Sequence, residues 1–131
     1  MTPAEQKERA VELLKQLENP DIAKLESMVA DNFEWRVMTR MPGFAPMKGK
    51  DALKGFAKGL KAMMPNGVNM KFGVVFSEGN NVSVQCESNT TAANGRKYNN
   101  LYNFYIRFAG DKIDQVLEYC DTNHAREVFV A

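Results

Sequence analysis

The segment from Tyr98 to His124, YNNLYNFYIRFAGDKIDQVLEYCDTNH, constrains the fold more than any other part of the chain. In its first half the more apolar residues recur at every second position, which is the spacing of side chains along one face of a β-strand. A glycine, Gly110, then separates this run from a second one. The segment therefore predicts two long antiparallel strands joined by a tight turn, with the more apolar face directed into the protein.

The inward face of this predicted hairpin combines polar tips with apolar side chains. On the first strand, it carries Asn100 and Tyr102 next to Phe104. On the returning strand, the alternation assigns Tyr119 and Asp121 to the same face, although here the pattern separates the two faces less cleanly. Polar groups set among aromatic ones are typical of a pocket for a small molecule.

Three short motifs in this region resemble the SnoaL-like or nuclear-transport-factor-2-like superfamily, which includes the ketosteroid isomerases and limonene epoxide hydrolase. The motifs are GRKYNNLYNF at 95–104, GDKI at 110–113 and LEYCDT at 117–122, and a looser resemblance extends over the whole chain. The resemblance implies a cone-shaped fold that encloses a pocket. It does not define an activity, because this scaffold hosts isomerases, hydrolases, cyclases and proteins without catalysis.

The first half of the chain predicts three helices. Residues 2–5, TPAE, form a capping box with proline at the first helical position, Asp21 can cap a second helix, and Asp51 can start a third. Helices followed by consecutive turn-linked strands favour a single α+β domain over 1–131, with a curved, mostly antiparallel sheet. The resemblance implies that the sheet forms a cone and that the three N-terminal-side helices close its pocket.

Two aromatic residues of the earlier predicted strands are candidates for the pocket wall. Trp35, the only tryptophan, falls on the inward face of a half-buried strand at 33–38. Its position fits ordinary core packing as well as the pocket border that the resemblance implies. Phe72 alternates with Val74 and Phe76 on one face of the clearest predicted strand, so all three are expected to share that face.

The segment MPGFAPMKG at 41–49 predicts a loop, because it contains two prolines and two glycines and has no regular period. Its apolar side chains, among them Phe44 and Met47, have two interpretations. They either close over the mouth of a pocket or simply fold back onto the core.

Composition excludes several classes of partner. The 17 basic and 16 acidic residues nearly cancel to a formal charge of +1, and no basic run is present, so we expect no nucleic-acid partner. No apolar run reaches the roughly 18 to 20 residues of a membrane span, and the amino terminus lacks the apolar core of a secretory signal. We therefore expect a cytoplasmic protein.

Cys86 and Cys120 are interpreted as small buried side chains, with a disulfide or a reactive thiol as the alternatives.

Asp121 is the first candidate for a catalytic base, since a carboxylate beside aromatic surface loses hydration and its pKa rises towards neutrality. The resemblance also implies an acidic residue near this strand end. The alternative is that Asp121 caps the following segment or pairs with Arg126 or Arg36. Tyr102 is the expected partner because its phenol can donate a hydrogen bond to a developing enolate oxygen, and Asn100 can orient a carbonyl or a water.

Glu118 and Glu87 are secondary candidates. Strict alternation directs both outward, and a β-bulge would reverse either assignment. His124 is the only histidine, which excludes a metal cluster built on histidines and makes this residue a polar candidate at the exit of the hairpin. The tail that follows, residues 122–131, has helical spacing and is either a last helical turn or an arm against a second subunit.

Three functions remain open at this point. The first is a cofactor-independent isomerase or polyketide-type cyclase that acts on a small apolar carbonyl compound, and no phosphate loop, zinc spacing or dinucleotide fingerprint contradicts it. The second is a binding protein that holds a small hydrophobic molecule without chemistry, for which Trp35 and Phe104 suffice. The third is a homodimer formed through the outer sheet face, where Leu101, Tyr105 and Val116 are expected.

Overall fold

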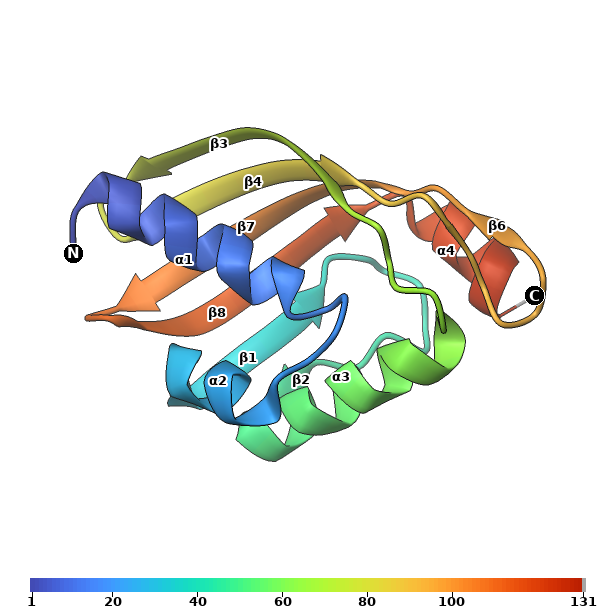
Figure 1. The fold of residues 1–131 in the computed structure, drawn as a ribbon, viewed down its shortest axis with the longest axis horizontal. Coiled ribbons are helices and arrows are strands. Elements are labelled where there is room, and N and C mark those ends of the chain that lie inside the picture. The colour runs from blue at the N-terminus through green and yellow to red at the C-terminus, as the bar shows by residue number, and fades with distance from the viewer. Residues whose placement is uncertain (131) are drawn as a thin grey trace.

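The predicted hairpin forms the centre of a curved six-stranded sheet (Figure 1). In this computed structural model, which describes residues 1–130, the strand order is β2-β1-β8-β7-β4-β3. Neighbouring strands are antiparallel except β1 and β8, which pair in parallel. The strands are β1 (Val29–Val37), β2 (Met47–Lys48), β3 (Lys71–Glu78), β4 (Asn81–Glu87), β7 (Leu101–Ala109) and β8 (Lys112–Cys120), with β5 (Thr90–Thr91) and β6 (Lys97–Tyr98) in a separate two-stranded sheet.

Four helices of the described residues pack around this sheet. In Figure 1, α1 lies across β3 and β4, α3 lies beside β1 and β2, and α4 lies beside β6 at the opposite end from the amino terminus. The predicted α+β class with a curved, mostly antiparallel sheet is therefore confirmed. The helices are α1 (Pro3–Lys15), α2 (Ile22–Met28), α3 (Lys50–Met63) and α4 (Thr122–Phe129).

The helix starts follow the local sequence. Thr2 Oγ1 accepts the Glu5 N–H at 3.1 Å and a Glu5 carboxylate oxygen accepts the Thr2 N–H at 3.1 Å, which confirms the predicted capping box. Asp21 caps α2 as predicted. Asp51 lies inside the first turn of α3 rather than at its start, because Gly49, with a φ of 86°, ends the preceding strand and takes the cap position. The predicted tail forms α4, and its last residue, Ala131, lies outside the described residues.

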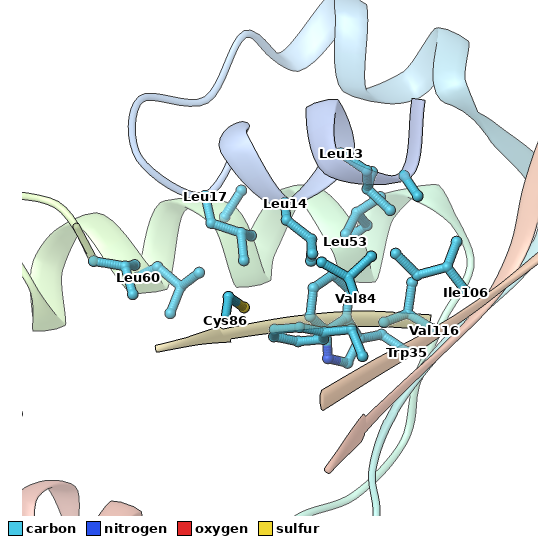
Figure 2. Packing of buried hydrophobic residues seen from close by; sticks show 14 of the residues in the cluster. Leu13, Leu14, Leu17, Trp35, Leu53, Leu60, Val84, Cys86, Ile106 and Val116 are labelled. Atoms are coloured by element: carbon cyan, nitrogen blue, oxygen red, sulfur yellow. The ribbon is translucent and has the colours of Figure 1, made fainter. Parts of the chain in front are cut away.

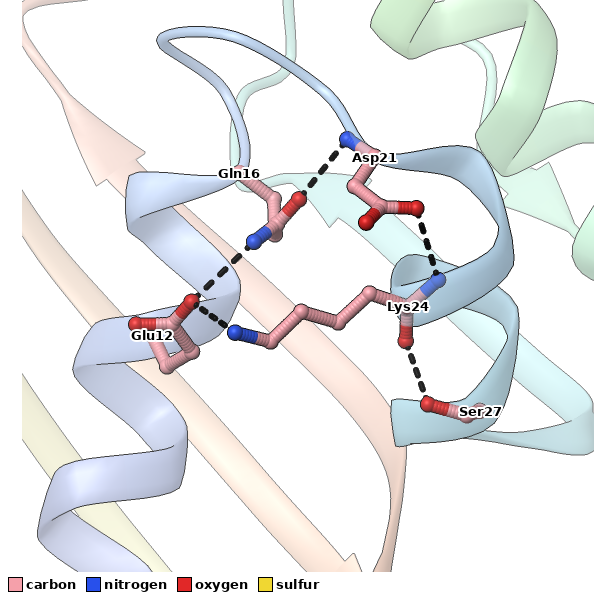
Figure 3. A network of polar contacts seen from close by, with 5 residues as sticks. All are labelled: Glu12, Gln16, Asp21, Lys24 and Ser27. Carbon is pink, nitrogen blue, oxygen red and sulfur yellow. Dashed lines mark hydrogen bonds and ion pairs between the residues drawn. The ribbon is translucent and has the colours of Figure 1, made fainter.

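A chain of polar contacts fixes α2 against α1 (Figure 3). The Gln16 side chain accepts the Asp21 N–H at 2.9 Å through its oxygen and donates to Glu12 at 3.1 Å through its nitrogen. Lys24 Nζ reaches the same Glu12 carboxylate at 2.7 Å. The first residues of α2 and its cap are therefore tied to the last turn and the C-cap of α1.

The core lies between the helices and the concave face of the sheet (Figure 2). Apolar side chains of α1 and α3 point towards the strands, where they lose nearly all contact with water. Burying each such side chain contributes about 1.5–3 kcal/mol. Those labelled in Figure 2 are Leu13, Leu14, Leu53 and Leu60 from the helices, Leu17 from the turn after α1, and Trp35, Val84, Cys86, Ile106 and Val116 from the sheet.

The predicted inward face of β7 is confirmed. Asn100, just before the strand, and Phe104, Ile106 and Phe108 within it are each at most 2% exposed, and Tyr102 is partly buried. These residues share a parity, so one face of β7 supplies much of the core.

The predicted inward face of β8 is wrong for its second half. Arg107 pairs with Gln115 but the next residue of β7, Phe108, pairs with Ile113, so Asp114 is an extra residue in β8. Such a bulge shifts the alternation by one. The residues after it that face inward are therefore Val116, Glu118 and Cys120, while Tyr119 and the helix cap Asp121 are exposed.

A second bulge corrects the assignment of β3. Phe72 pairs with Cys86 but Val75 pairs with Val84, which leaves one extra residue in β3 at Gly73-Val74. Val74 and Phe76 are consequently 59% and 56% exposed, on the opposite face from Phe72. The earlier prediction that all three share a face is wrong for this reason.

Both cysteines are free, and Cys86 is buried as interpreted from the sequence, whereas Cys120 is only partly buried. Cys86 and Cys120 both align with Tyr102, one from each neighbouring strand, and two strand spacings amount to about 10 Å. That separation is too large for a disulfide. Among the described residues, no helix has the length and apolar character that crossing a bilayer requires.

A pair of substitutions on β7 tests the assigned faces. Ile106→Ala removes a fully buried side chain and is expected to lower the free energy of unfolding by about 2–5 kcal/mol. Leu101→Ala, on the outer face and 66% exposed in the single chain, is expected to change the free energy of unfolding of the monomer by no more than about 0.5 kcal/mol. Urea denaturation measures both, and equal effects would contradict the assignment.

Candidate functional site

A cavity of about 230 Å³ lies between the sheet, α3 and α4, and it is the strongest candidate for a functional site. Its wall is almost entirely apolar and includes several methionines and aromatic rings. A larger hollow of about 630 Å³ on α1 is lined mainly by charged side chains and is open to solvent, so it offers no comparable enclosure. The cavity is lined by Leu17, Val37, Gly43, Phe44, Ala45, Met47, Phe56, Leu60, Met63, Met64, Val68, Met70, Tyr98, Tyr102, Phe104, Glu118, Ala125 and Phe129.

Three polar side chains belong to this lining: Tyr98, Tyr102 and Glu118. Tyr102 and Glu118 lie on the inward faces of β7 and β8, where Phe104 pairs with Glu118 and Tyr102 pairs with the next inward residue, Cys120. They are thus neighbours one step apart on the same surface. The lining contains no lysine, arginine or histidine, so Glu118 has no cationic partner within it.

The Glu118 carboxylate is held by two hydrogen-bond donors. Trp35 Nε1 donates to Oε1 at 3.1 Å, and Cys120 Sγ donates to Oε2 at 3.6 Å. Burial among apolar groups raises the pKa of Glu118 well above its ordinary range, because the charged form loses its hydration, while these two donors oppose part of the rise. Glu118 is therefore a strengthened base, kept in one orientation.

Trp35 is itself fixed by aromatic packing. Its ring centroid lies 5.1 Å from that of Phe56 on α3 and 5.8 Å from that of Phe104, which it meets edge-on. The indole is only 1% exposed and lies outside the cavity lining. Both interpretations of Trp35 hold in part, because it is a core residue whose N–H supports a residue of the cavity.

The two tyrosines form a hydrogen-bonded pair. The hydroxyl groups of Tyr98 and Tyr102 share a very short hydrogen bond, and Asn100 Nδ2 donates to the Tyr98 oxygen at 3.0 Å. Burial raises the pKa of Tyr98 to about 12 and raises that of Tyr102 further. Burial also raises the pKa of both Cys86 and Cys120 to about 12. All four groups are therefore neutral at physiological pH.

Asn100 is buried behind the cavity. Its oxygen accepts the N–H groups of Leu101 at 2.8 Å and Asp121 at 3.0 Å, and its Nδ2 also donates to the Asp121 carbonyl at 3.0 Å. It thereby joins the start of β7 to the start of α4. The predicted role of contacting a ligand does not fit this position, because its side chain is occupied by protein groups.

Asp121 does not face the cavity. It is exposed, and its carboxylate caps α4 by accepting the His124 N–H at 3.1 Å, which is the alternative that the sequence left open. Its predicted place beside Tyr102 on the inward face is wrong because of the bulge at Asp114. Tyr119 is 45% exposed for the same reason.

The remaining predicted residues lie at the periphery. Glu87 is exposed on the outer sheet face, and Phe72 is partly buried in a separate shallow hollow. His124 stacks on Tyr98 with a centroid separation of 5.5 Å and accepts the Asn99 N–H at 3.2 Å, so it backs the tyrosine pair without lining the cavity. Among the predicted set, the structure brings Tyr102, Phe104 and Glu118 together in the cavity.

Sequence reasoning missed Tyr98 and the contributions of α3 and α4. Tyr98 lies within the motif at 95–104 that carries the resemblance, but its own strand has two residues and shows no alternation. Phe56 of α3 lines the cavity and packs against Trp35, and the helical spacing of the sequence does not distinguish a residue that faces a cavity from one in a closed core. The predicted loop at 41–49 is wrong for Met47 and Lys48, which form β2, but both Phe44 and Met47 line the cavity, so this segment covers it rather than folding onto a closed core. Residues 1–130 contain no cluster of three or more side chains placed to bind a metal ion.

Comparison with known proteins identifies the family. The model of the SnoaL-like domain matches residues 10–116. No curated protein sequence matches the chain.

Solved structures share the whole fold at low identity. An NTF2-like protein from Burkholderia xenovorans LB400 has a TM-score of 0.82 at 17% identity, with 98% of each chain covered. A candidate SnoaL-like polyketide cyclase from Jannaschia sp. CCS1 has a TM-score of 0.82 at 13% identity, covering 98% of this chain and 94% of that one. A candidate isomerase from Bacillus subtilis has a TM-score of 0.78 at 17% identity, covering 95% and 94%. The match over residues 10–116, together with this common cone-shaped fold, shows that the chain belongs to the SnoaL-like domain family of the NTF2-like superfamily.

Proposed function

We propose that this protein binds a compact, neutral, carbonyl-bearing molecule in the cavity and moves a proton at the carbon beside the carbonyl. Glu118 is the base and Tyr102 is the hydrogen-bond donor to the oxygen. The observation that carries the proposal is a carboxylate with a raised pKa in an apolar cavity. A neutral phenol, that of Tyr102, is its diagonal neighbour on the adjacent strand and on the same sheet face.

The chemistry balances without a cofactor. The Glu118 carboxylate removes the proton from the α-carbon, and the C–H electron pair moves into the carbonyl to form an enolate, whose oxygen accepts a hydrogen bond from Tyr102. Return of the proton from Glu118 to a different carbon gives an isomer. Attack of the enolate carbon on a second carbonyl of the same molecule, followed by proton transfer from Glu118 to the new alkoxide, gives a ring.

The lining supports a neutral ligand. Glu118 would repel an anion when it is charged, and no basic side chain of the lining would compensate. The cavity volume of about 230 Å³ is below the roughly 300 Å³ at which ordinary ligand pockets begin, so the ligand is small. The candidate isomerase and the candidate cyclase with this fold favour the same two reaction types.

We also propose that the outer sheet face forms a homodimer. Phe76, Leu101 and Tyr119 are 56%, 66% and 45% exposed there, and several exposed apolar side chains on one sheet face are typical of an interface. Val116, which the sequence assigned to this face, is instead fully buried, because of the bulge in β8.

Hydrogen–deuterium exchange at the methyl group of acetophenone in D₂O, followed by proton NMR, tests the base. The wild-type protein is expected to accelerate exchange over buffer. Glu118→Gln is expected to lower the protein-catalysed rate at least about 100-fold, and Tyr102→Phe to lower it by a similar factor.

Glu87→Gln is the matched control, because it neutralises an exposed carboxylate on the outer face, and it is expected to leave the rate unchanged. Exchange by Glu118→Gln at the wild-type rate would contradict the assignment. Acetophenone binding without any exchange by the wild type would favour a binding protein without chemistry.

The raised pKa of Glu118 predicts a pH dependence of stability. The folded state holds this proton more tightly than the unfolded state, whose ordinary value is 4.5, so the contribution to stability is complete below that pH and is lost as pH rises through the folded pKa. Within that window, stability falls by up to about 1.4 kcal/mol per pH unit from this group. The surrounding tyrosines and cysteines are neutral there.

The measurement is the difference between the wild type and Glu118→Gln in urea denaturation from pH 4 to about pH 9. The variant is expected to gain stability relative to the wild type as pH rises, while Glu87→Gln shows no such trend. Carboxylates whose pKa is lowered, such as Glu12 and Glu34, make stability rise with pH. Subtracting the free energy of unfolding of the variant from that of the wild type at each pH removes this contribution. A pH-independent difference for Glu118→Gln would show that its carboxylate is not desolvated.

Leu101→Asp tests the dimer. A charge placed in an apolar interface loses hydration without a partner, so the variant is expected to sediment as a monomer at tens of micromolar where the wild type is a dimer. Lys58→Asp, on the exposed side of α3, is the control and is expected to remain a dimer. A monomeric wild type at this concentration would remove the proposal.

A further inference from the structure

The side-chain amide of Asn100 has only one orientation that satisfies its surroundings. The backbone N–H groups of Leu101 and Asp121 can only donate, and both point at the same atom of the side chain, at 2.8 and 3.0 Å. That atom must be the oxygen. The nitrogen is then directed at the Asp121 carbonyl and at the Tyr98 hydroxyl, each at 3.0 Å.

This orientation of the Asn100 amide determines which hydrogen bond the Tyr98 hydroxyl accepts and which one it donates. Its oxygen accepts a proton from Asn100, and its own proton needs an acceptor, because Tyr98 is only 3% exposed. The acceptor within reach is the Tyr102 oxygen, at the other end of the short bond between the two hydroxyl groups. If Tyr102 donated to Tyr98 instead, the Tyr98 oxygen would accept from both Asn100 and Tyr102. The proton of Tyr98, which is the more buried of the two tyrosines although both line the cavity, would then have no protein acceptor, which costs about 1–3 kcal/mol.

The same reasoning then applies to Tyr102. Its oxygen is occupied by the proton from Tyr98, so its own proton is directed away from Tyr98. Tyr102 lines the cavity, so its proton is available to an acceptor there. The three side chains form a one-way sequence of donors that runs from Asn100 through Tyr98 to Tyr102 and ends at the cavity.

We infer that Asn100 is a positioning residue that makes Tyr102 an obligatory hydrogen-bond donor to the cavity. The inference rests on the proposed function for its catalytic meaning, since a donor fixed in advance stabilises an enolate oxygen without reorganisation. It also narrows the ligand class. A group with a lone pair, such as a carbonyl oxygen, is favoured at this position, whereas an ammonium group has no lone pair to accept the proton.

The position of the shared proton can be measured in the free protein by NMR. With ¹³C-labelled tyrosine rings, the hydroxyl proton of the short bond correlates with the Cε carbons of the ring that carries it. We expect this proton to belong to Tyr98 and to be protected from exchange with water. A correlation with the Tyr102 ring, or the absence of any protected hydroxyl proton, would overturn the inference.

Asn100→Asp tests whether the side-chain amide of Asn100 determines which tyrosine donates the hydrogen bond between Tyr98 and Tyr102. The introduced carboxylate keeps an acceptor for the N–H groups of Leu101 and Asp121 but replaces the donor to Tyr98 by a second acceptor. Tyr98 is then expected to donate to this carboxylate, so that the shared proton moves to the Tyr102 ring. Asn99→Asp introduces the same charge at the exposed neighbouring position and is expected to leave the proton on Tyr98.

A folded Asn100→Asp variant with the proton still on the Tyr98 ring would also overturn the inference. If that variant does not fold, the assignment in the wild type decides alone. Neither measurement needs a substrate, so the result is independent of the exchange experiment with Glu118→Gln. The direction of the hydrogen bonds and the proposed proton transfer can therefore fail separately.

Discussion

One extra residue in β8 determines what the cavity contains. Because Asp114 has no partner of its own on β7, every later side chain of β8 is turned to the opposite face from the one that its spacing from Ile113 predicts. Glu118 is thereby placed among aromatic rings, and Asp121 is left at the surface to cap α4. Arg107 holds the extra residue in place, with its Nε 2.8 Å from the Asp114 carboxylate on the outer face.

The buried carboxylate is a local cost that the rest of the fold must offset. Glu118 has hydrogen bonds from Trp35 and Cys120 but no countercharge in the cavity, so its ionised form destabilises the folded state. The helices that pack on the concave face bury enough apolar surface to tolerate it. The same desolvation makes the carboxylate a stronger base, and the proposed proton transfer would use this property.

Sequence alone predicted the helices, the α+β class and the inward face of β7, because each depends on contacts close in sequence or on an unbroken period of two. It could not predict the faces of β8 and the second half of β3. Both depend on single inserted residues, Asp114 and the Gly73-Val74 position, which have no local signature and appear only in the pairing with a neighbouring strand. The role of Asn100 was hidden for a related reason, since its partners on α4 and β6 approach it only in the folded chain.

The cavity wall combines fixed and adaptable side chains. Glu118 and Tyr102 are held by hydrogen bonds to partly or fully buried partners, whereas other parts of the lining consist of Met47, Met63 and Met70. Methionine side chains are unbranched and change conformation at little cost, so this wall can reshape itself around ligands of different outline. If the proposed function holds, the site is strict about the group that reacts and tolerant of the carbon skeleton that carries it, so that a series of related compounds, rather than one, would share the site.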